Sequence, residues 1–388
     1  MTLRNATIRE PARADRPVPD HGGSRSDVEA LIRNMWGDPR NDIRKPLHIF
    51  FYLLSLPYGA AVRARNRLFD LGVLRQDNVG CPVVSVGNLT AGGTGKTPMA
   101  IQVAGMLRDR GLRPAVLSRG YGGKSTASVL VVSDGRQTLA GADEAGDEPV
   151  LIARRLRGIP VLAGAKRTLS AAYARENFGA DVLVLDDGFQ HRWIRRDLDI
   201  VLLDSRKPLG NGFLLPRGPL REPPESLERA GVVVFTRSED LPGPMDTGLS
   251  GLLSGRLMLR TRIRPIALIG IDGAEFPLSF LAGKRVFAFA GIARPESFRQ
   301  TLEDLGAVVA GFQALPDHHR FCAEDLRQIE RACSETGAEI LLTTEKDGVK
   351  LSGPVPFSRR LLCLAIETEI LDGTDGLEAA LTVCIEKR

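Results

Sequence analysis

Cysteine is scarce in this chain of 388 residues, and its few cysteines are scattered along the sequence. The five are Cys81, Cys322, Cys333, Cys363 and Cys384. An odd and unclustered set argues against a disulfide framework and favours a reducing compartment. Residues 1–17 also lack a secretory signal, because they carry charges of both signs and no apolar core. These absences predict a cytosolic protein.

Long apolar runs are absent as well. The most apolar stretch covers residues 47–56 and is followed by Pro57, whereas a membrane-spanning helix needs roughly 20 apolar residues. Three arginines come soon after it: Arg63, Arg65 and Arg67. A helix at residues 45–75 could lie in a membrane interface with these cations on anionic headgroups. It could equally pack on the protein's own core, and the residues alone leave both possibilities open.

The excess of positive charge is small. The formal net charge of +5 suits an anionic partner such as a nucleotide or acidic lipid, but it is too small to indicate a nucleic acid. The hydrophobic content of 43% and charged content of 26% are typical of a globular protein long enough for two domains. Residues 1–44 are rich in Pro, Gly, Arg and Asp, so we expect a mobile extension there.

The strongest local signal is a glycine-rich stretch. Residues 83–98 read VVSVGNLTAGGTGKTP, which predicts a buried strand, a tight turn and the start of a helix. The turn glycines let backbone N–H groups point at phosphate oxygens, Lys96 would reach the β- and γ-phosphates, and Thr97 would complete a Mg²⁺ shell. Thr90 stands where the usual G-x-x-x-x-G-K-[ST] pattern has its first glycine. The predicted nucleotide-binding residues are Thr90, Gly92, Gly93, Thr94, Gly95, Lys96 and Thr97.

Apolar strands alternate with helical segments along most of the chain. The strands predicted in the first series are 115–118, 129–133, 159–163, 182–185, 198–203 and 232–236; those of the second are 286–290, 340–344 and 361–366. This alternation predicts a largely parallel sheet covered on both faces. We expect a first α/β domain at residues 76–240, a connector at 241–264 with an extended segment at 256–263, and a smaller C-terminal α/β domain at 265–388.

Carboxylates follow several of these strands. Asp186 and Asp187 end an apolar strand, where a carboxylate near a phosphate loop can hold Mg²⁺. A plain turn is the simpler alternative. Asp147 precedes Pro149 at a helix start, where capping of free N–H groups is a sufficient explanation. It could also accept a proton from the phosphoryl acceptor, and His318 could orient such a carboxylate across a cleft.

Three arginines are candidates for binding an anionic substrate group: Arg119, Arg217 and Arg221. Arg119 follows a predicted strand, and the other two lie in a stiff loop rich in proline. A guanidinium can hold phosphate with two parallel hydrogen bonds. Many surface arginines have no such role, so this alternative stays open.

Seven motifs together resemble the tetraacyldisaccharide 4'-kinase family of lipid A biosynthesis. They occupy residues 86–98, 118–122, 146–149, 186–191, 215–223, 317–319 and 344–347. They occur in the family's order and extend from about Trp36 to near the end of the chain. The family tolerates a hydroxyl residue at the position of Thr90.

The resemblance implies a kinase that uses ATP and Mg²⁺ to phosphorylate the 4'-hydroxyl of an acylated glucosamine disaccharide phosphate. It implies a P-loop NTPase-type parallel sheet domain joined to a smaller α/β domain by a β-strand linker. It places the enzyme peripherally at the cytoplasmic face of a bacterial inner membrane, which favours membrane contact by residues 45–75. By position, Asp147 would be the catalytic base assisted by His318 rather than His319. Thr97 and Asp186 would serve the metal, and Asp187 the geometry of the attacking oxygen.

Two other functions remain open on the sequence. One is a P-loop kinase or ATP-dependent ligase that acts on a soluble small molecule. The other is a non-catalytic nucleotide switch at a membrane, which the two carboxylate sites disfavour. The apolar segment followed by arginines separates the lipid kinase from the soluble one.

Overall fold

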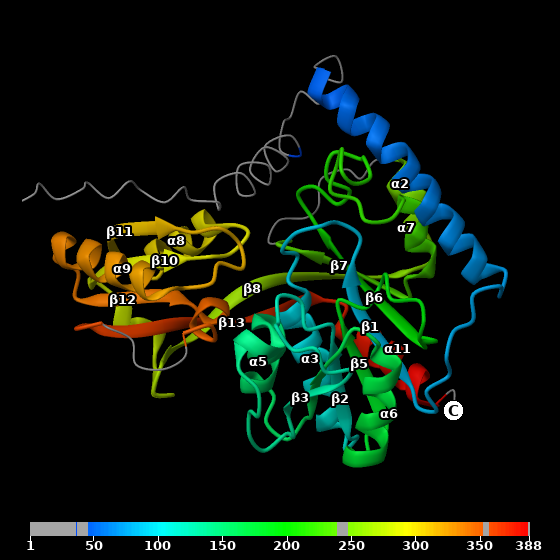
Figure 1. Cartoon of the computed structure of the whole chain (residues 1–388), viewed down its shortest axis with the longest axis horizontal. Coiled ribbons are helices and arrows are strands. Elements are labelled where there is room, and N and C mark those ends of the chain that lie inside the picture. The colour runs from blue at the N-terminus through cyan, green and yellow to red at the C-terminus, as the bar shows by residue number, and fades with distance from the viewer. Residues whose placement is uncertain (1–35, 37–45, 239–246, 352–356, 387–388) are drawn as a thin grey trace, which may run out of the picture.

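The computed structural model describes Trp36 and residues 46–238, 247–351 and 357–386 (Figure 1). The expected mobile extension, except Trp36, and residues 241–246 of the expected connector lie outside the described residues. Among those described, α/β structure extends through both halves of the chain, which confirms the predicted fold class.

The first half is built on a mostly parallel sheet. Its strands are β1 (Val83–Asn88), β2 (Pro114–Ser118), β3 (Leu130–Ser133), β4 (Val161–Ala163), β5 (Val182–Asp186), β6 (Leu198–Asp204) and β7 (Val232–Thr236). Only β3 among these seven pairs antiparallel, with β4. The helices are α3 (Lys96–Asp109), α4 (Ala142–Ala145), α5 (Asp147–Arg155), α6 (Arg167–Phe178), the 3₁₀ helix η1 (Pro224–Arg229) and α7 (Thr247–Leu253). Strands β1, β5, β6 and β7 are buried along their whole length, as their continuous apolar sequences predict.

The second half has its own α/β series. Its strands are β8 (Leu257–Gly270), β9 (Glu275–Phe276), β10 (Arg285–Ala290), β11 (Val308–Ala314), β12 (Ile340–Thr344) and β13 (Arg360–Asp372). The helices are η2 (Leu278–Leu281), α8 (Pro295–Asp304), α9 (Ala323–Thr336), α10 (Glu345–Gly348) and α11 (Thr374–Glu386).

Two long strands join the halves. The sheet runs in the order β11-β10-β12-β13-β8-β7-β6-β1-β5-β2-β4-β3, so β13 and β8 lie side by side between β12 of the second half and β7 of the first (Figure 1). β8 pairs parallel with β7 through residues 257–260 and antiparallel with β13 through most of its length. The extended segment expected at 256–263 is therefore the first part of β8. Two strands therefore connect the halves: β8 leads from the first half into the second, and β13 leads back to α11.

Helix α11 packs on the first half although it follows the second in sequence. Leu377, Leu381 and Cys384 belong to the same buried cluster as Val232 and Val234 of β7. The first half's core is therefore closed by the last described helix of the chain.

Helix α2 (Pro46–Asp70) lies along the outside of the first half (Figure 1). It continues through Pro57, the residue that follows the most apolar run. Pro57 is on the exposed side, and the turns around it are held by burial of Ser55, Gly59 and Val62. Packing therefore outweighs the lost hydrogen bond. By length and composition alone α2 could cross a membrane, and only 22% of its most apolar window is buried.

Candidate active site

The glycine-rich loop joins β1 to α3. Gly92 and Gly95 have φ values of 115° and 83°, a backbone region that side chains with a Cβ rarely adopt. Asn88 Nδ2 donates to Thr94 Oγ1 at 2.9 Å and to the Gly92 carbonyl at 3.4 Å. The loop is thus shaped by its own residues before any ligand binds.

Lys96 and Thr97 open helix α3 directly after this loop, and each is less than a tenth exposed. Thr90 is nearly buried and pairs with Leu220 in an isolated β-bridge. The Ala91 N–H donates to the Pro219 carbonyl at 2.7 Å. The loop at 213–223 therefore lies directly against the entry to the glycine-rich loop.

Asp186 and Asp187 stand at the carboxyl end of β5, which pairs with β1. Asp186 is almost fully buried, and Ser118 Oγ at the end of β2 lies 3.5 Å from its Oδ2. Burial raises the pKa of Asp186, and the nearby carboxylates Glu148 and Asp187 raise it further. A cation beside this carboxylate would favour its ionised form and lower its pKa.

Asp187 has a φ of 49°, an uncommon backbone conformation outside glycine. Arg221 Nη1 lies 2.9 Å from both of its carboxylate oxygens, and Lys96 Nζ lies 3.6 Å from Oδ1. Burial raises the pKa of Asp187, but Lys96 and Arg221 outweigh burial, so its pKa is lower than usual. Asp187 therefore orients two cations at the glycine-rich loop.

Arg167, at the start of α6, holds the backbone of both aspartates. Its Nη2 donates to the Asp186 carbonyl at 2.7 Å and its Nη1 to the Asp187 carbonyl at 3.0 Å. It is 2% exposed, and burial lowers its pKa. The sequence did not single it out, because one arginine at a helix start carries no local signal of burial.

Asp147 and His318 meet across the two halves of the chain. His318 Nδ1 lies 2.9 Å from Asp147 Oδ2. Burial raises the pKa of Asp147, but the His318 hydrogen bond and the charge of Lys346 bring it below its usual value. The bond to Asp147 raises the pKa of His318 in spite of burial. His318 also has a φ of 59°, so local backbone strain accompanies this pairing.

The neighbours of this pair distinguish the two histidines. Lys346 Nζ lies 3.3 Å from His318 Nε2 and 3.6 Å from Glu148 Oε1. His319 Nε2 instead lies 2.9 Å from Asp325 Oδ2 in the first turn of α9. Of the two, His318 is thus the one that contacts Asp147. The sequence assigns no role to Lys346 within the motif at 344–347. It lies 28 residues after His318 in the chain, and the fold brings the two side chains together.

The three candidate arginines lie in different environments. Arg221 reaches Asp187, and Arg119 is exposed at the end of β2. Arg217 is fully buried, with its guanidinium 4.8 Å from the centre of the Phe213 ring. The substrate contact expected of Arg217 therefore has no exposed atom to act through in this conformation. Its position inside the 213–223 loop is that of a residue that stabilises the loop.

The fold and these side chains define a P-loop-type α/β nucleotide-binding protein with a carboxylate–histidine pair at the carboxyl end of its sheet. Comparison with known proteins makes this specific. The chain belongs to the tetraacyldisaccharide-1-P 4'-kinase family, whose model matches residues 47–386.

Relatives of similar length support the assignment. The chain is 50% identical to the tetraacyldisaccharide 4'-kinase of Syntrophus aciditrophicus, over 88% of this chain and 95% of that protein. It is 48% identical to that of Anaeromyxobacter dehalogenans strain 2CP-C, over 85% and 88%. A crystal structure of LpxK from Aquifex aeolicus in complex with ATP superposes with a TM-score of 0.73 at 33% identity, covering 87% of this chain and 99% of that one.

Proposed function

We propose that this chain transfers the γ-phosphate of ATP to the 4'-hydroxyl of a tetraacyldisaccharide 1-phosphate in lipid A biosynthesis. The observation that carries the proposal is the Asp147–His318 pair at 2.9 Å, at the same end of the sheet as the glycine-rich loop. A carboxylate held by imidazole can accept the proton of a sugar hydroxyl as the new bond to phosphorus forms. Family membership and the names of its relatives supply the substrate.

The remaining residues act by position and charge. Phosphoryl transfer needs mainly alignment and neutralisation of the phosphate oxygens. The N–H groups of residues 92–97 and the Lys96 ammonium would bind the triphosphate. Asp187 holds both Lys96 and Arg221, so it sets where two positive charges meet the transferred group. Arg119, exposed beside Ser118, would bind an anionic group of the acceptor.

Thr97 and Asp186 would hold the Mg²⁺ that accompanies ATP. Asp186 Oδ1 is buried and accepts no hydrogen bond from the described residues, and the surrounding carboxylates favour a cation there. Oxygen donors of this kind suit Mg²⁺. When bound, the ion would neutralise charge on the phosphate oxygens.

Helix α2 supports a peripheral position at the cytoplasmic face of the inner membrane. Its outward face is apolar, with Ile49, Phe50, Leu53 and Leu56 each between 46% and 57% exposed. Its inward face is partly polar. An acceptor that carries four acyl chains stays in the bilayer, so the active site has to reach it there. The same face disfavours the soluble-substrate kinase, and no nucleic-acid partner is proposed.

The test offers the purified protein ATP, Mg²⁺ and tetraacyldisaccharide 1-phosphate in non-ionic detergent micelles. We expect ATP-dependent formation of the 4'-phosphorylated product. A protein that turns over ATP with a soluble sugar acceptor but leaves the lipid unchanged would favour the soluble-substrate alternative.

A further inference from the structure

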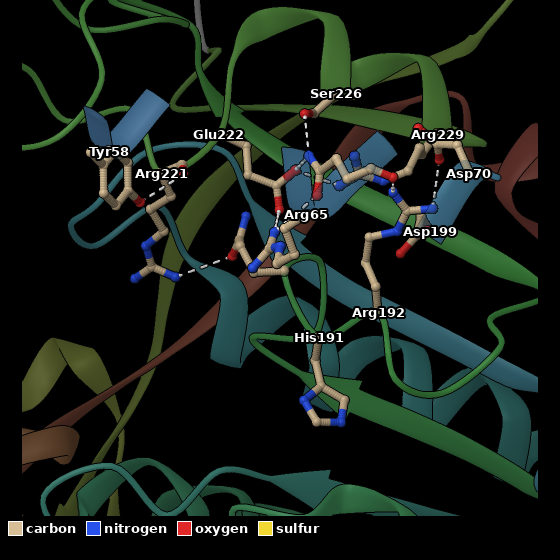
Figure 2. Close-up of polar contacts among 12 residues, drawn as sticks. Tyr58, Arg65, Asp70, His191, Arg192, Asp199, Arg221, Glu222, Ser226 and Arg229 are labelled. Carbon is tan, nitrogen blue, oxygen red and sulfur yellow. Dashed lines mark hydrogen bonds and ion pairs between the residues drawn. The ribbon is translucent and has the colours of Figure 1, made fainter. Parts of the chain in front are cut away.

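Helix α2 contacts the 213–223 loop beside the active site through buried and partly buried polar contacts, besides presenting an apolar face outward. Figure 2 shows Tyr58 and Arg65 of α2 directed at Arg221 and Glu222 of the 213–223 loop. Glu222 has no exposed surface. A buried carboxylate is costly unless charged or polar donors satisfy it.

Most of the donors to Glu222 come from α2. Arg65 Nη2 lies 2.9 Å from Oε1, and Asn66 Nδ2 lies 2.9 Å from Oε2. The third donor is Arg229 at 2.8 Å, from η1. Burial raises the pKa of Glu222, but Arg229, Asn66 and Arg65 outweigh burial and lower it. The carboxylate is thus satisfied only while α2 lies against the loop.

Arg221 precedes Glu222 in the loop and connects it to the active site. Its side chain contacts Asp187. Its N–H donates to the Leu89 carbonyl at 2.9 Å, at the entry to the glycine-rich loop. Its carbonyl accepts from the Tyr58 hydroxyl at 2.8 Å. Helix α2 therefore holds the backbone from which the Arg221 side chain extends to Asp187.

The packing of α2 on this loop leaves little freedom. A Cβ added to Gly59 would lie 2.8 Å from Leu214 Cδ1, so the helix backbone packs directly against a side chain of the loop. The Tyr52 ring meets the Phe213 ring edge-on at 5.9 Å. The contact therefore extends over both ends of the loop.

We propose that Tyr58, Arg65 and Glu222 are positioning residues, through which docking of α2 sets Arg221 at Asp187 for phosphoryl transfer. A shift of the Arg221 backbone would move one of the two cations on Asp187 out of place, and errors of about 1 Å at a reacting centre can cost on the order of a hundredfold in rate. The inference rests on the proposed function for its kinetic readout. It assigns α2 a role in the chemical step that is separate from membrane attachment.

The sharpest probe is Tyr58→Phe, which removes one hydroxyl and keeps the ring. In micelles, where attachment to a bilayer does not limit the reaction, we expect kcat to fall about five- to tenfold, as for one lost hydrogen bond. The KM for ATP should change less than twofold. The matched control is Tyr173→Phe on α6, an exposed tyrosine, which should leave kcat unchanged. An unchanged kcat in Tyr58→Phe would overturn the proposal.

A double-mutant cycle separates positioning from general weakening of the fold. If Tyr58 acts through Arg221, Tyr58→Phe should cost nothing further in an Arg221→Gln background. Additive losses would instead show that the hydroxyl acts independently, and would contradict the proposal. Arg65→Met, which keeps the aliphatic stem but loses a donor to Glu222, should behave as Tyr58→Phe does. Its control is Arg299→Met, an exposed helix arginine on α8.

A readout that needs no turnover keeps the two proposals distinguishable. Amide hydrogen exchange in residues 213–223 should rise in Tyr58→Phe and Arg65→Met, with β5 unchanged. If the wild type fails to phosphorylate the lipid but this exchange rises, the proposed function fails and the contact between α2 and the loop stands. If exchange in 213–223 is the same in all variants, α2 does not hold Arg221.

Discussion

At the scale of single residues, the charge states of Asp147 and His318 depend on each other. The pKa of His318 is raised, so its contribution to stability is fully present below its unfolded value near 6.5 and is lost as pH rises through its folded value. The pKa of Asp147 is lowered, so its contribution is present above its unfolded value near 3.8 and is lost as pH falls through its folded value. The pair therefore stabilises the fold most between these two unfolded values.

The first prediction follows from that window. His318→Gln should lower the free energy of unfolding by about 1–3 kcal/mol at a pH between 4 and 6, as for a hydrogen bond to a charged group. The difference should shrink as the pH rises through the raised pKa of His318, because the wild-type imidazole then loses its proton. Urea unfolding over a series of pH values measures it. A difference that does not change with pH would mean that the ionic form of the pair adds no stability.

A second prediction separates catalysis from helix capping at Asp147. The residue begins α5, and its Oδ1 accepts the Glu148 N–H at 2.9 Å, so capping is the alternative role. Asp147→Asn keeps an oxygen for that contact but cannot take a proton. We expect kcat to fall roughly 10²–10⁴-fold while ATP affinity stays within a few-fold. Single-turnover kinetics and calorimetry give the two values. Equal losses of kcat and of ATP affinity would indicate that Asp147 caps the helix and is not the catalytic base.

Residues next to a strand end or inside a motif were predictable, and those that act from a distance were not. Asp186, Asp187 and Lys96 follow from a strand that ends in carboxylates and from a glycine-rich turn. Arg167 carries no such signal, because the Asp186 carbonyl that it contacts lies 19 residues away along the chain. The motif at 215–223 includes Glu222 but does not indicate its contact with Asn66, which lies 156 residues away. Arg217 and Arg221 share one loop, yet one is buried and the other faces Asp187. Sequence spacing contains no information on that difference.

At the scale of elements, α2 inverts the usual distribution of side chains. His48, Ser55 and Asn66 are buried while Phe50 and Leu53 are more than half exposed. The sequence alone could not decide between a membrane helix and a core helix, because apolar periodicity does not say which face is covered. The structure has both features at once: a partly polar face on the protein, where Val62 and Phe69 are also buried, and an apolar face outward.

The third prediction tests that outward face. Phe50→Ser with Leu53→Ser should weaken binding to vesicles of phosphatidylethanolamine and phosphatidylglycerol by roughly tenfold or more, since each buried apolar side chain contributes about 1.5–3 kcal/mol. Vesicle flotation measures the bound fraction. Activity in micelles should fall much less, because both positions lie on the face away from Glu222.

The matched control changes two apolar residues with similar exposure elsewhere. Ile271→Ser with Val308→Ser alters side chains that are 53% and 47% exposed in the second half of the chain. Flotation of this variant should equal that of the wild type. Equal flotation of all three proteins would mean that α2 does not carry membrane binding.

At the scale of the whole molecule, the two halves are one continuous sheet. The alternation of strands and helices predicts two α/β series, but it does not show that β8 and β13 pair over most of their length. It also does not show that the chain returns, so that α11 packs on β6 of the first half and on the connecting strand β8. Long-range pairing of this kind is set by which apolar faces remain uncovered, and no local pattern records it.

The last prediction uses this return. Leu381→Ala should destabilise the protein by about 2–5 kcal/mol, because the side chain is fully buried in the cluster that supports β7. The matched control is Val383→Ala on the same helix, where the side chain is 48% exposed, and its effect should be within about 0.5 kcal/mol. Urea unfolding, with ATP binding measured at each urea concentration, distinguishes whether α11 folds with the first half or with the second. If α11 is part of the nucleotide-binding half, Leu381→Ala should lose unfolding free energy and ATP binding in one transition. If unfolding separates into two transitions and ATP binding survives the first, α11 belongs to the second half, and the continuous sheet does not fold as a unit.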